Sequence, residues 1–178
     1  LTLFGLLLAV LAAACVLNRQ GIGAVAMPAA AALVWAAWFC DRTDGMLARI
    51  RRAATPLGAW LDANVDETVD LGLHLVIAHV AAATTGTLLP WGLLVGFLFG
   101  KYLLMHGLAT TPSAVDEPPV GDGDGSASLL RRLYHLPGNA DVRLHLLVAA
   151  LATNCLVTEL AIVAAYYNCL LYTSPSPR

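Results

Sequence analysis

The most informative part of the chain is residues 41–70, which read DRTDGMLARIRRAATPLGAWLDANVDETVD. Half of the 12 acidic residues of the chain lie here, namely Asp41, Asp44, Asp62, Asp66, Glu67 and Asp70. The stretch separates two apolar runs, residues 22–40 and 71–89, each close to the roughly 20 residues that a membrane-spanning helix needs. Ionisable groups are costly at the ends of membrane spans, so they are functional candidates by default.

The rest of the chain has the composition of a membrane protein. Hydrophobic residues make up 58% and charged residues only 12% of the 178 residues, whereas about a quarter of a soluble domain is charged. Residues 1–17, 91–108 and 144–171 are further apolar segments. The last is too long for one straight span, so we interpret it as a fifth helix ending near Thr158 and a sixth starting at Leu160, with one long tilted helix as the alternative. The prediction is an all-α polytopic bundle of about five or six transmembrane helices.

The basic residues predict how this bundle sits in the membrane. They concentrate in the links after the second and fourth spans, as Arg49, Arg51, Arg52, Arg131, Arg132 and Arg143. By the positive-inside rule both links face the cytoplasm, which places the acidic stretch on that side. We expect an integral protein of a bacterial inner membrane. The net charge of −2 disfavours nucleic acid as a partner.

Other polar segments carry less information. The sequence GDGDGS at positions 121–126 is similar to a calcium loop, but Leu133 stands where the bidentate Glu is required, so we expect no calcium site. Residues 128–135 suit either an interfacial helix or a solvated linker. The four cysteines lack metal-ligand spacing, and we expect buried thiols. We interpret residues 172–178 as a tail foreign to a single membrane domain of residues 1–171.

The spacing of the carboxylates predicts a helical hairpin. Asp41 and Asp44 are three residues apart and share one helix face, and Asp62 and Asp66, four apart, share another. Asp70 extends the second row by one turn. Between the pairs, Thr55 can cap a helix whose first turn suits a proline, here Pro56. The two carboxylate pairs can therefore face each other across an antiparallel hairpin.

Four carboxylates in one place repel each other unless a cation lies among them. Oxygen ligands at this density suit Mg²⁺ or Mn²⁺, and two divalent ions bridged by carboxylates can clamp a phosphoryl group. Gly45, Ala48 and Gly58 leave room for a backbone or a phosphate to approach. Arg49 offers a positive fork for phosphate oxygens. The alternative is a solvated charge cluster at the membrane edge without catalytic function.

These residues match a known pattern. Asp41, Asp44, Gly45, Ala48 and Arg49, followed after eight residues by Gly58, Asp62 and Asp66, resemble the DxxDGxxAR-x8-GxxxDxxxD signature of the CDP-alcohol phosphatidyltransferases. Every fixed position is filled without insertion or deletion. The resemblance implies a membrane enzyme of about six helices. Such enzymes move a phosphatidyl group from a CDP-linked lipid alcohol, usually CDP-diacylglycerol, to the hydroxyl of an acceptor alcohol and release CMP.

The resemblance also implies roles for individual residues. Asp41, Asp44, Asp62 and Asp66 would bind two Mg²⁺ or Mn²⁺ ions, and Asp66 would also be the general base on the acceptor hydroxyl. The CDP site would be lined by Gly45, Ala48, Arg49, Thr55 and Gly58. The partners would be the CDP-lipid donor, the acceptor alcohol and membrane lipids, and a homodimer is usual among such proteins.

Two other functions remain open from the sequence. A UbiA-type prenyltransferase also uses aspartate-rich motifs and Mg²⁺, but its two motifs lie far apart on different repeats. An ion channel or transporter with an acidic vestibule would bind metal without turnover. The acceptor alcohol is also open, because no residue discriminates among glycerol phosphate, an inositol compound, serine, choline or another phospholipid.

Overall fold

The fold is described from a computed structural model, in which residues 2–51, 55–110 and 140–173 are described. These residues form seven helices and no strand. The helices are α1 (Thr2–Leu17), α2 (Arg19–Ile22), α3 (Ala26–Ile50), α4 (Pro56–Thr85), α5 (Leu89–Thr110), α7 (Ala140–Thr153) and α8 (Leu156–Thr173). The all-α prediction is thus confirmed. The GDGDGS loop, residues 128–135, Arg131, Arg132 and positions 174–178 of the expected tail lie outside the described residues.

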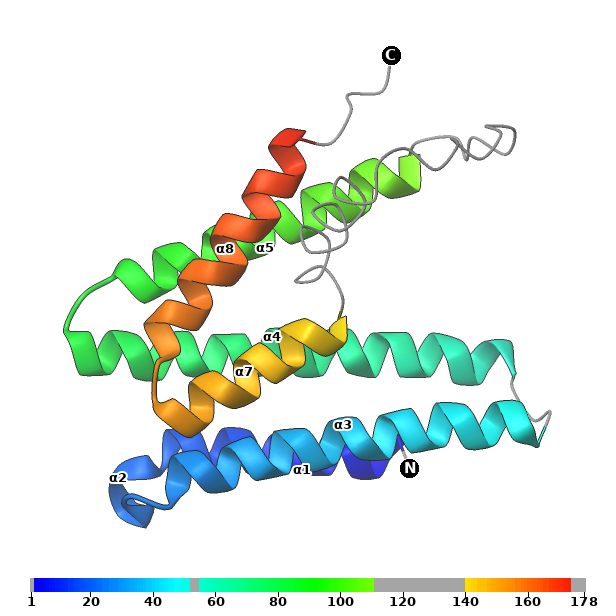
Figure 1. The fold of residues 1–178 in the computed structure, drawn as a ribbon, viewed down its shortest axis with the longest axis horizontal. Helices are drawn as coiled ribbons and strands as arrows, with labels where there is room; N and C mark the ends of the chain where they lie inside the picture. The colour runs from blue at the N-terminus through cyan, green and yellow to red at the C-terminus, as the bar shows by residue number, and fades with distance from the viewer. Residues whose placement is uncertain (1, 52–54, 111–139, 174–178) are drawn as a thin grey trace, which may run out of the picture.

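The helices form two layers that share α4 and α7 (Figure 1). In one layer, α1 packs against α3 and also against α4. In the other, α5 packs against α8, and both contact α4. Helix α7 joins the layers because it packs against α3 and α8. The end of α3 and the start of α4 lie at the same end of the bundle (Figure 1), and the acidic stretch extends from there along both helices.

Local sequence explains where the central helices begin and end. The Thr55 side chain accepts a hydrogen bond from the Gly58 backbone N–H at 3.1 Å, and Pro56 is the first residue of α4, as predicted. At the other end of α4, Gly86 has φ of +66°, a left-handed conformation that glycine adopts without steric cost. Helix α4 is therefore one continuous 30-residue element, with the candidate aspartates in its first half.

The last apolar segment is divided earlier than the sequence predicts. Helix α7 ends at Thr153 and α8 begins at Leu156, so the two-helix interpretation holds and the single tilted helix is wrong. Asn154 lies between them with φ of +59°, a left-handed conformation that asparagine tolerates better than most residues. Glu159, which suggested a break near Thr158, lies inside α8 and is 1% exposed. Its polarity reflects a buried interaction rather than a helix end.

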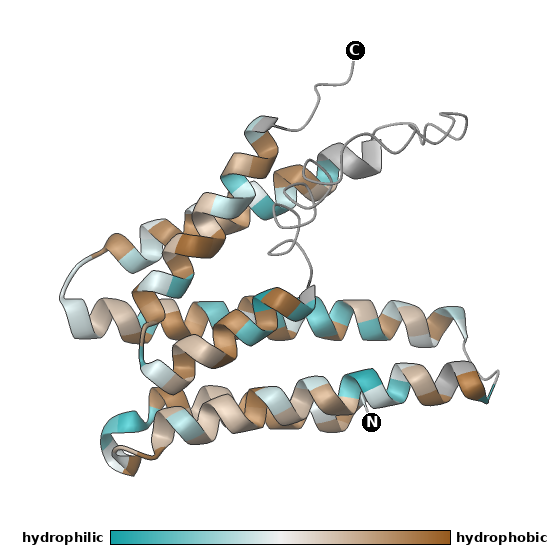
Figure 2. Cartoon of the chain, viewed as in Figure 1, coloured by the Kyte–Doolittle hydropathy of each residue, from teal (hydrophilic) through white to brown (hydrophobic). Residues whose placement is uncertain are grey.

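Hydrophobic residues run along the helices of both layers (Figure 2). Small residues are frequent among the buried ones, and many large apolar side chains are exposed. Ala12, Ala30 and Ala78 are completely buried, which lets neighbouring backbones approach closely, as is common in membrane helix pairs. Leu3, Leu7 and Val10 on α1 are more than half exposed. Two helices meet the length and hydropathy expected of a membrane span, α4 and residues Leu89–His106 of α5, whereas α1 and α8 are apolar but shorter.

A tight helix contact lies at Gly100, where α5 packs against α8. A Cβ atom at this position would lie 2.9 Å from the Tyr167 Cβ and 3.0 Å from the Asn168 backbone nitrogen. Four residues earlier on α5, the Gly96 carbonyl accepts a hydrogen bond from Asn168 Nδ2 at 2.9 Å. Helix α8 therefore packs closely along the side of α5 that carries Gly96 and Gly100.

We expect Gly100→Ala to destabilise the folded protein by about 1–3 kcal/mol, the usual cost of overpacking a tight contact. Gly92→Ala is the matched control, because it lies on the same helix and a Cβ there meets nothing within 4 Å. Thermal unfolding of both purified variants in detergent provides the measurement. Equal unfolding midpoints for the two variants would contradict the close packing of α5 on α8.

Candidate active site

In the hairpin of α3 and α4, three of the four aspartates are connected by short contacts. They are Asp41, Asp44 and Asp62. Asp44 on α3 and Asp62 on α4 both contact the hydroxyl of Thr2, which comes from the start of α1. The distances from Thr2 Oγ1 are 3.1 Å to Asp44 Oδ2 and 3.3 Å to Asp62 Oδ1. The Thr2 backbone N–H also donates to Asp44 Oδ2, at 3.2 Å. Two carboxylates from different helices therefore meet at the start of α1, and carboxylate oxygens are ligands that suit a cation.

Asp41 belongs to the same group. Burial raises the pKa of Asp41, and the negative charge of Asp62, with which it shares a hydrogen bond, raises this pKa further. Two carboxyl groups can share a hydrogen bond only through a proton held by one of them. Asp41 and Asp62, which come from different helices, are thus close enough to behave as a coupled pair.

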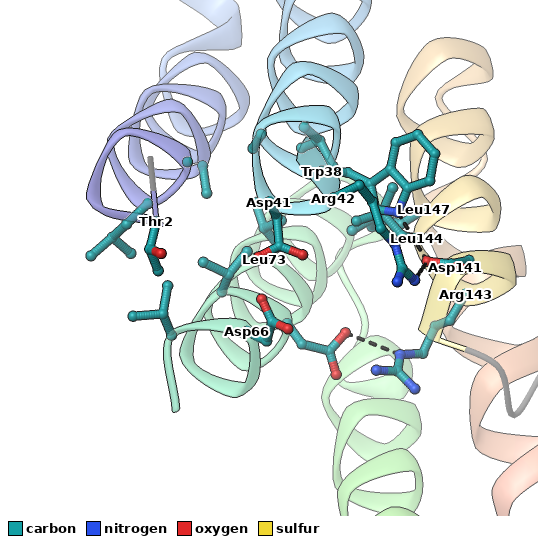
Figure 3. Close-up of a pocket in the computed structure, with 18 residues that line it drawn as sticks. Thr2, Trp38, Asp41, Arg42, Asp66, Leu73, Asp141, Arg143, Leu144 and Leu147 are labelled. Atoms are coloured by element: carbon teal, nitrogen blue, oxygen red, sulfur yellow. Dashed lines mark hydrogen bonds and ion pairs between the residues drawn. The ribbon is translucent and has the colours of Figure 1, made fainter. Parts of the chain in front are cut away.

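Asp66 lies one turn further along α4, beside a cavity of about 330 Å³. Figure 3 shows the Asp41 and Asp66 carboxyl groups turned into this space from opposite helices. Helices α1, α3, α4 and α7 all contribute to the lining, and its inner part is apolar, with Leu73 and Leu147 among the residues. Asp66 is exposed, so its carboxylate is accessible to a ligand that enters the cavity.

One wall of the cavity contains an ion pair that the sequence did not predict. Arg42, from α3, pairs with Asp141 at the start of α7. Trp38 Nε1 also donates to Asp141 Oδ1 at 3.0 Å. The hydrogen bond from Arg42, followed by that from Trp38, lowers the pKa of Asp141. The pair fixes the first turn of α7 against α3, as Figure 3 shows.

A second unpredicted cluster lies deeper on α4. Asp70 Oδ2 accepts from Lys101 Nζ at 2.6 Å, and Asp70 Oδ1 accepts from Arg143 Nε at 3.1 Å. Lys101 comes from α5 and Arg143 from α7. The sequence shows Asp70 as an extension of the acidic row and Lys101 as an isolated charge in an apolar helix, so only the fold reveals this cluster.

The remaining predicted site residues lie around the α3–α4 turn. Gly45 is half-buried on α3, and Thr55 and Gly58 are exposed at the start of α4. A Cβ at Gly58 would lie 3.1 Å from Thr55 Oγ1, so the cap leaves little room there for a larger residue. Ala48 and Arg49 belong to α3, but their side chains lie outside the described parts of the chain.

The donor chemistry fits the predicted divalent metal, although the aspartates are linked pairwise. Over residues 2–51, 55–110 and 140–173, no three acidic, histidine or cysteine side chains converge as a metal-binding group. Asp44 and Asp62 meet at Thr2, and Asp41 meets Asp62 directly. These hard carboxylate oxygens are the ligands that Mg²⁺ and Mn²⁺ prefer. Metal binding by Asp41, Asp44, Asp62 and Asp66 therefore stays a prediction. The chemistry of these carboxylates is compatible with it.

Comparison with known proteins identifies the family. The family model for CDP-alcohol phosphatidyltransferases matches residues 1–121, a range that includes α1, α3, α4 and α5 together with all four aspartates. No curated protein sequence matches the chain. The family match covers well over half of the 178 residues. The chain therefore belongs to the CDP-alcohol phosphatidyltransferase family.

Proposed function

We propose that the protein transfers a phosphatidyl group from CDP-diacylglycerol, or a closely related CDP-linked lipid, to the hydroxyl of an acceptor alcohol and releases CMP. Membership of the family supports transfer from a CDP-alcohol in general. The observation that carries the proposal is the meeting of Asp41 on α3 with Asp62 on α4, next to an accessible Asp66. Carboxylates on two antiparallel helices are thus available to one ligand.

The aspartates supply the ligands for two divalent ions in this proposal. Asp41, Asp44, Asp62 and Asp66 would hold them. The bound ions would neutralise the diphosphate and stabilise negative charge on the leaving CMP. The meeting of Asp44 and Asp62, from different helices, at the Thr2 hydroxyl supports this role.

The start of α4 would receive the nucleotide part of the donor. Thr55 and Gly58 lie at the N-terminus of a 30-residue helix, where backbone N–H groups and the helix dipole favour phosphate. Gly45, Ala48 and Arg49 approach the same turn from α3. The Thr55 hydroxyl accepts from Gly58 N–H and keeps its own proton to donate, so we assign the phosphate contacts to Thr55, the neighbouring backbone N–H groups and Arg49.

Asp66 would be the general base. A free alcohol is a poor nucleophile, and proton removal by a positioned carboxylate typically contributes about 10²–10⁴-fold to the rate. Asp66 lines the 330 Å³ cavity, which falls within the usual size range of pockets for small ligands. We therefore place the acceptor alcohol in this cavity, with its hydroxyl at Asp66. The oxygen of the acceptor attacks the β-phosphorus of the donor, the bond to CMP breaks, and Asp66 takes the proton.

The proposal includes the position of the enzyme in the membrane. Lipid tails of the donor would lie against the exposed apolar side chains of the bundle, and the nucleotide would stay in water at the α3–α4 turn. The arginines of this turn place it on the cytoplasmic side by the positive-inside rule. The bacterial inner membrane and a homodimer also belong to the proposal.

A CMP-release assay tests the proposed reaction. Purified full-length protein in detergent micelles is incubated with CDP-diacylglycerol, Mg²⁺ and one acceptor at a time, from glycerol phosphate, inositol, serine and choline. We expect CMP to form only when one particular acceptor is present. Release of pyrophosphate from a prenyl diphosphate, with no CMP from any acceptor, would favour a prenyltransferase and contradict the proposal. The assay also identifies the acceptor, which the described residues do not specify.

A further inference from the structure

A buried polar network lies on α4 beyond the aspartate pairs. It contains the Lys101 and Arg143 contacts of Asp70 described above. One turn further along α4, His74 Nδ1 lies 2.7 Å from the Asp70 carbonyl oxygen, and His74 Nε2 lies 3.1 Å from Glu159 Oε1 on α8. His74, Lys101 and Glu159 are 0%, 4% and 1% exposed. The network thus ties α4 to α5, α7 and α8.

Helix α4 depends on these ties for its position. Among the described residues, no Cα atom of α3 comes within 8 Å of a Cα atom of α4. The two helices that carry the four signature aspartates therefore do not fix each other by close backbone packing, and their carboxylates repel. Helix α1 supports one side of α4, with Thr2 at Asp62. On the other side, Lys101 donates to both Glu67 Oε1 and Asp70 Oδ2 at 2.6 Å, and Arg143 donates to Asp70. These charged contacts link the part of α4 next to Asp66 to α5 and α7.

The helix that carries Lys101 is itself firmly held. Gly100, the residue before Lys101, packs tightly against Tyr167 and Asn168 of α8. Tyr167 on α8 also accepts a hydrogen bond from Arg143. Lys101 and Arg143 therefore come from helices that are held in place by their contacts with α8. Asp70 is bound by both of these cations.

Buried charges are an expensive way to hold helices together. Apolar residues of similar size often give equal or greater stability, so a retained buried ion pair points to a requirement for one specific arrangement. Here Asp70 lies one helical turn from Asp66, and both residues line the cavity. A rotation or shift of α4 would move both residues together, and would change the distance from Asp66 and Asp62 to Asp41.

We propose that Asp70, held between Lys101 and Arg143, is a positioning residue that sets α4 so that Asp62 and Asp66 face Asp41 and Asp44. The inference rests on the proposed function, because that function requires the four aspartates to bind the same metal ions. It differs from a role of Lys101 and Arg143 in binding an anionic acceptor, because an acceptor would first have to displace Asp70 from both.

The test measures Mn²⁺ affinity of the purified full-length protein by electron paramagnetic resonance of the free ion. In Lys101→Met, we expect binding to weaken by about 10- to 100-fold, the usual effect of removing a partner that orients a metal ligand. Loss of a nearby positive charge alone would act in the opposite direction and tighten Mn²⁺ binding. The sign of the change therefore separates positioning from simple electrostatics.

Two further variants complete the design. Arg19→Ala also removes one positive charge and one contact to α4, the hydrogen bond to Thr84 at the far end of the helix, and we expect its Mn²⁺ affinity to stay within about twofold of the wild type, inside the ordinary context dependence of single contacts. Lys101→Arg keeps the charge and serves if Lys101→Met does not fold. Its larger fork in a site that is 4% exposed should still displace Asp70 and weaken Mn²⁺ binding several-fold.

The outcomes are distinct. Weaker Mn²⁺ binding in the Lys101 variants, with a reduced kcat and an unchanged KM for the acceptor, supports the positioning role. Unchanged or tighter binding in the folded Lys101 variants, or a rise in acceptor KM alone, overturns it. Wild-type protein that binds no Mn²⁺, or an Asp41→Asn variant that binds it normally, would overturn the proposed function itself. A failure confined to the Lys101 variants would leave that function standing.

Discussion

Asp66→Asn is expected to reduce CMP release by a factor of about 10³ or more. Asparagine keeps the size of the side chain but cannot accept the acceptor proton, and general-base catalysis alone typically accounts for about 10²–10⁴-fold. The change also removes one of the four proposed metal ligands. Asp66 is exposed beside the cavity and not part of the packed core, so the variant should fold normally. Its rate is measured as CMP formed from CDP-diacylglycerol at saturating acceptor.

Binding of the donor should survive this change. Asp66 lies on the cavity side of α4, whereas Thr55 and Gly58 lie three and two turns earlier, at the proposed nucleotide end. CDP-diacylglycerol binding to Asp66→Asn should therefore remain measurable. Asn64→Ala is a suitable control, because Asn64 is exposed on the same helix and its side chain donates locally to the Trp60 carbonyl. Near-normal turnover in Asp66→Asn would show that another group removes the proton.

Local sequence was sufficient to predict the helical hairpin. The cap at Thr55, the proline after it and the three- and four-residue spacing of the aspartates are all interactions within one or two turns. Such features depend on backbone geometry that is nearly independent of the rest of the chain. The prediction that a helix begins at Pro56 behind a Thr55 cap was confirmed for this reason.

Contacts between distant segments could not be predicted in the same way. Asp70 and Lys101 are 31 positions apart, and His74 and Glu159 are 85 apart. In the sequence, each is a single polar residue in an apolar run, which is equally typical of a topology anchor or a helix end. Glu159 led to a helix break being placed too late for this reason. Only packing of α5, α7 and α8 around α4 shows that these residues are partners.

The Arg42–Asp141 pair shows the same limit at the site itself. Arg42 occupies a position of the family signature at which the residue type is free, so the motif gives no reason to single it out. Asp141 follows a long polar link and is typical of a solvated loop end. Their contact fixes α7 against α3 and closes one wall of the cavity. The shape of the acceptor site is therefore set partly by residues outside the signature.

Removal of divalent ions should have the second large effect, on both activity and stability. Chelation should abolish CMP release, and added Mg²⁺ should restore it, because four carboxylates have no other proposed way to hold the donor diphosphate. Bound metal also stabilises the folded state by mass action, by about 2.7 kcal/mol at a concentration 100 times the dissociation constant. The unfolding midpoint of the wild type should therefore rise steeply with Mg²⁺.

Asp62→Asn separates this explanation from a general salt effect. In the metal-free protein, Asp62 adds negative charge beside Asp41 and raises the pKa of Asp41 after the effect of burial. A carboxyl whose pKa is raised by folding binds more protons when folded, so it reduces stability as the pH rises above about 3.9, its usual value. Without metal at neutral pH, Asp62→Asn should thus unfold at a higher temperature than the wild type.

With Mg²⁺ the order of the two proteins should reverse. Asp62→Asn lacks a metal ligand, so Mg²⁺ should stabilise it much less than the wild type, and the two curves of midpoint against Mg²⁺ concentration should cross. Sodium chloride at matched ionic strength screens carboxylate repulsion in both proteins and should not produce a crossing. Parallel curves would mean that Asp62 does not contribute to metal binding. A wild type that gains nothing from Mg²⁺ would contradict the metal site as a whole, since the carboxylates that meet between α3 and α4 would then repel each other without any compensating ligand.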